Sequence, residues 1–177
     1  IYNLYLLTPD TIAGPFAQDW ENSEASQYEK FGLNVVISPD GMKFARMTNS
    51  DVSVPKIYLY EFDRCSGTFS MPRTIHMPDS TEFSPWIAIS PNSKLLYLQS
   101  GQTKLYQYDL SASDISASVK LVGLYDGFET PQGFSGEFNA MALAPNNKIY
   151  MCCTSGIYYY HTIHKPDRLG TACDFRQ

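Results

Sequence analysis

Short apolar runs alternate with turn-forming residues along this chain, in a pattern that occurs three times at intervals of roughly fifty residues. Each run ends in a small residue, a proline and two turn formers, at 35–41, 87–93 and 141–147. A second pattern follows each run, an apolar residue with tyrosines at alternate positions, at 56–60, 104–108 and 156–160. Such runs, bounded by Pro, Asn, Asp and Gly, are typical of short β-strands joined by tight turns. The pattern therefore predicts an all-β chain.

Each repeat resolves into four strands. The innermost strand is the apolar run before the proline, and the second is expected at 43–47, 94–99 and 148–153. The tyrosine pattern forms the third, and a less regular outer strand is placed near 74–77 and 120–124. Repeats of this length and composition are the signature of a β-propeller. Residues 3–7 match the tyrosine pattern of a preceding blade.

The sequence thus predicts a partial propeller of about three and a half four-stranded blades, part of a larger ring. Residues 1–31 are the outer half of a preceding blade plus a loop, and the blades span 32–80, 81–135 and 136–177. Because such a piece exposes sheet edges and apolar faces, further blades are expected from additional chain or from a second copy. The tight turns after the inner strands are assigned to Pro39, Asp40, Gly41, Pro91, Asn92, Pro145 and Asn146.

Aromatic residues are unusually frequent, with 13 Tyr, 10 Phe and 2 Trp among 177 residues. We expect the tyrosines of the repeated pattern to pack between blades, with a carbohydrate platform as the alternative. They are Tyr58, Tyr60, Tyr106, Tyr108, Tyr158 and Tyr160. Two long loops, 13–30 and 125–137, connect outer to inner strands and should lie on one rim. Their aromatic residues, Trp20, Tyr125, Phe128 and Phe134, are the candidates for binding protein or glycan.

Charge and hydropathy exclude some partners. The formal net charge is −5, whereas a nucleic-acid surface needs a basic excess. No apolar run is long enough to span a membrane. The chain begins at Ile1 without an initiator Met, which we interpret as a processed or excised piece.

The four cysteines show no zinc-type spacing. Cys152 and Cys153 are adjacent in a predicted strand and are expected to be buried as small apolar residues. Cys65 and Cys173 lie in turn-like stretches, and a disulfide between them is possible, which would imply an oxidising compartment.

Three stretches resemble one family of proteins. They are Phe-Asp-Arg-Cys-Ser-Gly at 62–67, an element at 141–150 similar to Leu-Ala-Pro-Asp-Gly-Lys-Ile-Tyr, and the segment 164–175 with its Gly-Thr-Ala-Cys-Asp-Phe end. Together they resemble the propeller regions of large secreted surface proteins of Bacteroidetes, the type IX secretion and gliding-associated group. The resemblance implies a secreted or cell-surface location. The sequence departs from that group by stopping at Gln177 without a sorting domain, and the group supplies no catalytic motif.

Candidate chemistry is sparse. No Gly-x-Ser-x-Gly elbow, Cys–His pair or phosphate loop is recognisable, and no catalytic residue is assigned. His161 and His164 are three apart, so a strand would point them to opposite faces. A calcium ion held in the channel by Asn34, Glu137 and Asn139 is a possible cofactor, although no cofactor is expected. The sequence favours a non-enzymatic binding or adhesion module; the alternative is a calcium-dependent propeller enzyme acting on a sugar or lactone.

Overall fold

The computed structural model of the protein describes residues 2–18, 34–50, 53–70, 72–78, 85–155 and 157–177. Throughout this part of the chain the structure consists of β-strands and two short 3-10 turns, η1 (Ser116–Ser118) and η2 (Gly170–Cys173). The predicted all-β class is confirmed.

The strands form a two-stranded hairpin and three larger antiparallel sheets. The N-terminal hairpin consists of β1 (Tyr2–Leu7) and β2 (Ile12–Gln18). The first sheet contains β3 (Val35–Ile37), β4 (Lys43–Ser50), β5 (Ser53–Asp63), β6 (Thr68–Phe69) and β7 (Arg73–His76). The second sheet contains β8 (Trp86–Ile89), β9 (Leu95–Ser100), β10 (Lys104–Asp109) and β11 (Lys120–Leu124). The third sheet contains β12 (Phe138–Leu143), β13 (Ile149–Cys153), β14 (Tyr160–Ile163) and β15 (Phe175–Arg176).

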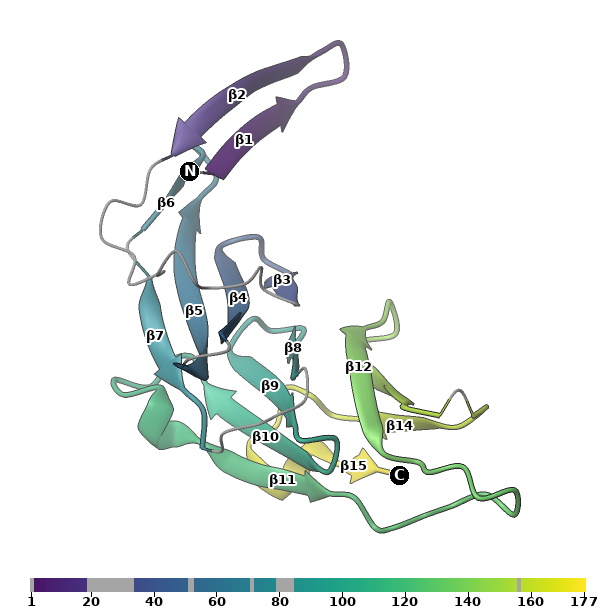
Figure 1. Ribbon diagram of the computed structural model, residues 1–177. Helices are drawn as coiled ribbons and strands as arrows, with labels where there is room; N and C mark the ends of the chain where they lie inside the picture. Colours follow the sequence, from purple (N-terminus) through teal and green to yellow (C-terminus); the bar gives the residue numbers. More distant parts are fainter. Residues whose placement is uncertain (1, 19–33, 51–52, 71, 79–84, 156) are drawn as a thin grey trace.

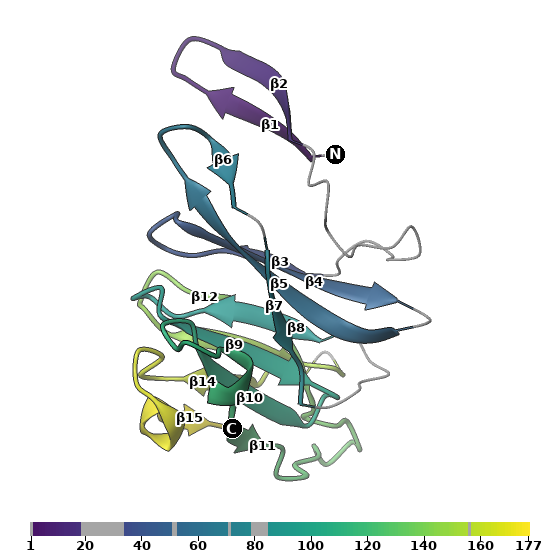
Figure 2. The same cartoon turned by 90° about the vertical axis from the view of Figure 1, so that its left-hand side faces the viewer.

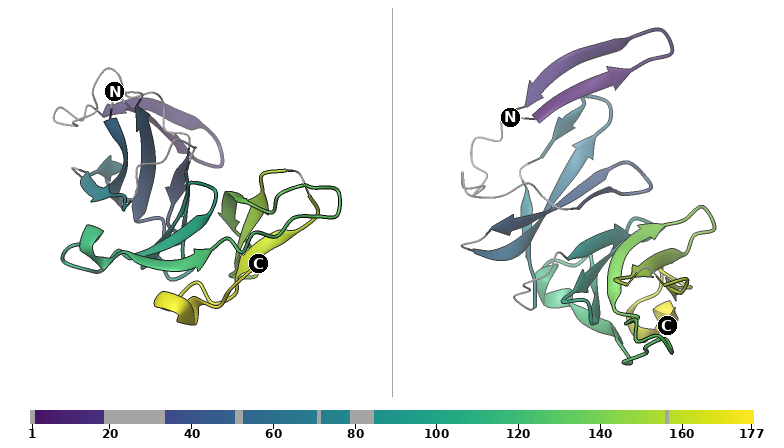
Figure 3. Two further views of the ribbon diagram at one scale, coloured as in Figure 1. Left: turned by 60° about the horizontal axis from the view of Figure 1, so that its bottom comes forward. Right: turned by 45° about the vertical axis from the view of Figure 1, so that its right-hand side comes forward.

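Each sheet is a meander in which successive strands are neighbours, and in the first sheet β6 and β7 both pair with β5 at different levels. The sheets follow one another along an arc from the hairpin to the C-terminus (Figure 1), and Figure 2 shows them stacked. The hairpin and the C-terminal segment lie at opposite ends of this succession (Figure 3). Neighbouring propeller blades are arranged in this way. The described part of the chain is therefore propeller-like, and its arc is open.

Two apolar cores hold the three larger sheets together. The first core joins the first and second sheets and contains Ala45, Met47, Ile57, Leu59, Ile87, Ile89, Leu96 and Leu98. The second core joins the second and third sheets and contains Ala88, Leu95, Tyr97, Leu105, Phe138, Met141, Ile149 and Met151. Alternate residues of β9 enter different cores because successive strand side chains point to opposite faces. Each fully buried Leu, Ile, Met or Phe side chain stabilises the fold by about 1.5–3 kcal/mol, so the two cores are the main source of cohesion between the sheets.

Polar side chains tie the second sheet to the third. The buried Tyr97 hydroxyl donates to the carbonyl of Pro166 (2.9 Å) and accepts from Gln107 Nε2 (2.7 Å). Gln107 Oε1 in turn accepts the backbone N–H of Gly170 at 2.7 Å. Burial raises the pKa of Tyr97, so the phenol stays neutral and keeps its donor. These bonds fix the segment before η2 against the second sheet.

The turns after β3 and β8 share one construction. The Ser38 hydroxyl donates to Asp40 Oδ1 (2.5 Å) and accepts from the Lys43 N–H (2.8 Å). The Ser90 hydroxyl likewise donates to Asn92 Oδ1 (2.7 Å) and accepts from the Leu95 N–H (2.9 Å). The proline of each turn, Pro39 or Pro91, sits between these partners. The serine hydroxyl therefore closes the turn around the proline.

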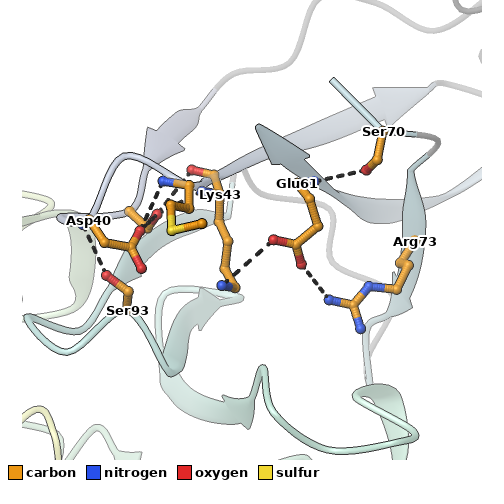
Figure 4. A network of polar contacts seen from close by, with 8 residues as sticks. Asp40, Lys43, Glu61, Ser70, Arg73 and Ser93 are labelled. Atoms are coloured by element: carbon orange, nitrogen blue, oxygen red, sulfur yellow. Dashed lines mark hydrogen bonds and ion pairs between the residues drawn. The ribbon is translucent and has the colours of Figure 1, made fainter. Parts of the chain in front are cut away.

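Hydrogen bonds also connect one such turn to the next. The Asp40 N–H donates to Ser93 Oγ of the second sheet at 3.2 Å, as Figure 4 shows. The Asn92 N–H donates in the same way to Asp167 Oδ1 of the third sheet at 2.9 Å. Gly41 has φ +70°, a conformation that glycine adopts without strain. These bonds set the spacing of the sheets at the end opposite the loop 125–137.

The third sheet closes its first turn one residue sooner. The Ala144 N–H donates to the Lys148 carbonyl, four residues on, whereas the Ser90 N–H donates to the carbonyl of Leu95, five residues on. Ala144 lacks the hydroxyl that holds the longer turn. The turn through Pro145 and Asn146 keeps the side-chain cap, because Asn146 Oδ1 accepts the Lys148 N–H at 3.3 Å.

This shorter turn changes the faces of the next strand, since a shift of one residue moves every side chain to the opposite face. Ile149, five residues after Ala144, pairs with Leu143. In the second sheet it is Leu96, six residues after Ser90, that pairs with Ile89. Ile149 and Met151 accordingly face the second core.

The predicted third strand at 156–160 is wrong, because β14 begins at Tyr160. Tyr58 pairs with Arg46 and Tyr106 with Leu98, but the matching position opposite Met151 is His161. Ile163 stands where Tyr60 and Tyr108 stand in the earlier sheets. Tyr58, Tyr60, Tyr106 and Tyr108 are buried as expected, whereas Tyr158 and Tyr160 are 99% and 64% exposed. The prediction that Tyr158 and Tyr160 pack between blades is therefore wrong.

Two further expectations are corrected. Residues 13–18, assigned to a loop because of Gly14 and Pro15, belong to β2, where proline is tolerated because a two-stranded hairpin consists only of edge strands. The disulfide between Cys65 and Cys173 is not formed. Cys65 is exposed on the turn after β5, whereas Cys173 is fully buried in the second core, so the two free thiols belong to different sheets.

Candidate functional site

The loop 125–137 between β11 and β12 projects from the rim of the stack, at the lower right in Figure 1. Its own backbone folds it, because the Gly133 N–H donates to the Thr130 carbonyl at 2.8 Å and the Thr130 N–H to the Phe134 carbonyl at 2.9 Å. Tyr125 braces it from beneath: its hydroxyl donates to the Phe128 carbonyl and accepts the Gly136 N–H. The loop is therefore held in a defined conformation by its own hydrogen bonds, with side chains such as Phe128 and Phe134 exposed.

The structure places the predicted binding residues in two different roles. Phe128 and Phe134 are 41% and 51% exposed. Tyr125 is half-buried, and its ring packs edge-on against Phe138 at 6.0 Å, so it supports the loop. Trp20 lies outside the described residues. The loop therefore offers two exposed phenylalanines in place of the predicted set of aromatic residues.

A second aromatic segment, which the sequence did not predict, joins this loop. Residues 157–159 lie between β13 and β14, and Tyr159 packs edge-on against Phe128 with ring centroids 5.5 Å apart. Tyr158 is 99% exposed, Tyr159 59% and Tyr160 64%. We call Phe128, Phe134, Tyr158, Tyr159 and Tyr160 the aromatic rim. No local sequence signal pairs the two segments, because the contact depends on the register of β14.

A pocket of about 290 Å³ lies at the aromatic rim. It is lined by Asp126, Phe128, Gly136, Cys153, Tyr159, Tyr160, His161 and Gln177. Pockets that take small molecules begin at about 300 Å³, so this one suits a single small group. Rings and a carboxylate dominate its wall.

His161 and Cys153 approach each other at the base of this pocket, with Nε2 and Sγ 3.4 Å apart. Burial lowers the pKa of His161, and burial raises the pKa of Cys153, so both groups are held neutral. His161 Nε2 donates a hydrogen bond to the Gly136 carbonyl oxygen, at a distance of 2.6 Å. A ring nitrogen that donates to a carbonyl cannot accept the thiol proton, and an activated cysteine needs a thiolate. The pair is therefore a support for the loop.

The candidate calcium ligands lie at the starts of two inner strands, β3 and β12. Asn34 Oδ1 accepts the Ile87 N–H at 3.0 Å and so joins the first two sheets. Asn139 lies on β12 and Glu137 just before it. Within the part of the chain that the structure describes, no group of three or more His, Cys, Asp or Glu side chains is placed to hold a metal ion. His161 and His164 belong to different environments, one buried and one half-buried.

A second polar cluster lies on the first sheet and links neighbouring strands (Figure 4). Glu61 accepts from Arg73 at 2.9 Å and lies 3.7 Å from Lys43 Nζ. Burial opposes ionisation of Asp40, yet hydrogen bonds from Ser38 and Met42, with Lys43 nearby, together lower its pKa. Surface ion pairs of this kind contribute about 0–1 kcal/mol. The cluster therefore fixes strand positions and offers no reactive group.

Among the described helical segments, none has the length and hydropathy that crossing a membrane requires. No protein-family model matches the chain, and no curated protein is significantly similar to it in sequence.

Solved structures are similar in fold. A protein of unknown function from Bacteroides thetaiotaomicron aligns with 75% of this chain and 30% of its own at 13% identity, with a TM-score of 0.50. TolB from Acinetobacter baumannii aligns with 73% of this chain and 39% of its own at 22% identity, with a TM-score of 0.42. The chain thus spans well under half the length of either protein. At these identities the likeness concerns the fold alone, and it does not show the type IX-secreted family.

Proposed function

We propose that this chain is part of a β-propeller that acts as a non-enzymatic binding module, engaging a protein or glycan through the loops of one rim. The aromatic rim carries the proposal. Five large aromatic side chains between 41% and 99% exposed lie on the loop before β12 and on the segment that leads into β14, and the two segments meet where Phe128 contacts Tyr159. Exposed aromatic groups on a rigid support are characteristic anchors for partners.

The ring proposal follows from the repeated packing of the sheets. The inner and second strands of the second sheet pack against the first sheet, and the same strands of the third sheet pack against the second sheet in the same way. At the open ends the corresponding apolar side chains are uncovered, with Val35 56% and Ile37 64% exposed on the first sheet. Another blade, from further chain or from a second copy, would cover such a face.

We propose further that the chain belongs to an exported bacterial surface protein with a role in adhesion. Its support is the resemblance of 62–67, 141–150 and 164–175 to the type IX secretion and gliding-associated group. A non-enzymatic role is supported by the bonding of His161 Nε2, which donates to the Gly136 carbonyl and so cannot take the proton of the Cys153 thiol. No specific contact favours the calcium-dependent alternative.

A binding survey tests the proposal. Wild-type protein and the double variant Phe128→Ala/Phe134→Ala would be screened against a random-peptide display library and a glycan array. Truncation of anchors typically costs about 2 kcal/mol or more each, so ligands of the rim should lose at least about tenfold in affinity. Met42→Ala, 54% exposed in the turn before β4 at the opposite end of the strands, is the matched control. The absence of any ligand, or ligands that the double variant binds equally well, would count against the proposal.

A further inference from the structure

The pocket at the aromatic rim has three aromatic walls. Phe128, Tyr159 and Tyr160 line it, and the first two rings meet at an interplanar angle of 77°. Perpendicular rings form a corner that offers π-faces in two directions. The electron-rich face of an aromatic ring attracts cations within about 6 Å of its centroid.

The charged side chain that lines the pocket is acidic. Asp126 is a lining residue, and the lining contains no Lys or Arg. Asp126 Oδ1 accepts the Phe128 N–H at 2.9 Å, which orients the carboxylate. Among the described residues no donor lies within hydrogen-bond distance of its second oxygen, which leaves that oxygen for a ligand. With a formal net charge of −5 on the chain, the pocket favours a cation and disfavours an anion.

Two polar side chains of the lining, Gln177 and His161, are bonded to neighbouring backbone groups. Gln177 accepts the Asp126 N–H at 3.1 Å and donates to the Leu124 carbonyl at 2.9 Å. His161 Nε2 is committed to the Gly136 carbonyl. A sugar ring needs several free amide, imidazole or carboxylate partners for its hydroxyls, whereas an alkylammonium group needs chiefly ring faces and one carboxylate.

From this chemistry we infer that the pocket binds an alkylammonium group, namely the lysine side chain of a protein partner, held between the rings of Phe128, Tyr159 and Tyr160 and the carboxylate of Asp126. The inference rests on the proposed function and names the class of ligand that the rim takes. A protein partner, rather than a glycan, is then the ligand. The volume of about 290 Å³ suits the end of one such side chain.

Choline is the first probe, because it has a compact ammonium group and a neutral isostere, 3,3-dimethylbutan-1-ol. Calorimetric titration should show choline binding with Kd on the order of 1 mM, and the isostere should bind at least about tenfold more weakly. Asp126→Asn keeps an oxygen to accept the Phe128 N–H but removes the charge, and Tyr159→Leu removes one wall. Each should weaken choline binding about fivefold to tenfold. Tyr5→Leu, at an exposed tyrosine of the N-terminal hairpin outside the aromatic rim, should leave it unchanged.

The outcomes separate the two proposals. Peptides enriched in lysine that compete with choline, and that bind the Asp126→Asn variant more weakly, support the inference. Equal binding of choline and its isostere, or loss of choline binding on Tyr5→Leu but not on Tyr159→Leu, overturns it. If only sugars bind and they need Phe128, the inference fails while the proposed function stands. If neither choline, peptide nor glycan depends on the aromatic rim, both fail.

Discussion

Replacing Ser90 by alanine tests how the turns set strand register. The Ser90 hydroxyl is fully buried, donates to Asn92 Oδ1 at 2.7 Å and accepts the Leu95 N–H at 2.9 Å. Ser90→Ala leaves the Leu95 N–H without that acceptor in a buried position, which costs about 1–3 kcal/mol. The third sheet shows the other available arrangement, since Ala144 occupies the same place and closes its turn one residue sooner.

Urea denaturation followed by tryptophan fluorescence measures the effect. With an m-value of about 2 kcal/mol/M, the midpoint should fall by about 0.5–1.5 M. Ser113→Ala, on an exposed turn, is the matched control and should stay within about 0.5 kcal/mol of wild type. A Ser90→Ala midpoint equal to that of the control, together with unchanged amide exchange of β9, would refute the argument that the hydroxyl holds the register.

Three further outcomes are expected. Gly123→Ala would place a Cβ 2.6 Å from the Phe175 ring, so it should destabilise the protein by about 1–3 kcal/mol, measured by thermal unfolding; an unchanged Tm would contradict the packing. Because burial lowers the pKa of His161, the contribution of this residue to the unfolding free energy should be constant above pH about 6.5 and decrease below it by at most about 1.4 kcal/mol per pH unit. His161→Gln should remove that decrease, and an identical pH profile in the variant would reject it. A thiol reagent should label exposed Cys65 in the native state and Cys173 only after unfolding; labelling of neither would indicate a disulfide.

Local signals in the sequence were sufficient for the first two repeats. Proline flanked by serine and by Asp or Asn identified the turns, and the runs before it, such as Trp86–Ile89, became the inner strands. The alternating tyrosines, such as Tyr58 and Tyr106, were buried because alternation places them on a covered face. In these repeats the periodicity and the cross-strand partners agree.

The third repeat shows where local signals are insufficient. Residues 156–160 match the tyrosine pattern, yet the strand begins at Tyr160, because His161 and Ile163 are the residues that pair with Met151 and Ile149. Cross-strand partners, not resemblance along the chain, decide the register. The contact of Phe128 with Tyr159 arises from that register and from the path of a separate loop. The candidate site therefore could be anticipated only for the loop 125–137.

Tyrosine nitration mapped by mass spectrometry tests the central claim most directly, namely that Tyr158, Tyr159 and Tyr160 are exposed at a binding rim whereas the tyrosines of the second sheet are buried between sheets. Tyr158, Tyr159 and Tyr160 should react rapidly, and Tyr97 and Tyr108 should react only after unfolding. Adding the ligand found for the rim should protect Tyr159 and Tyr160 and leave Tyr158 reactive. Protection of Tyr158 in the free protein, or rapid nitration of Tyr97, would contradict the account.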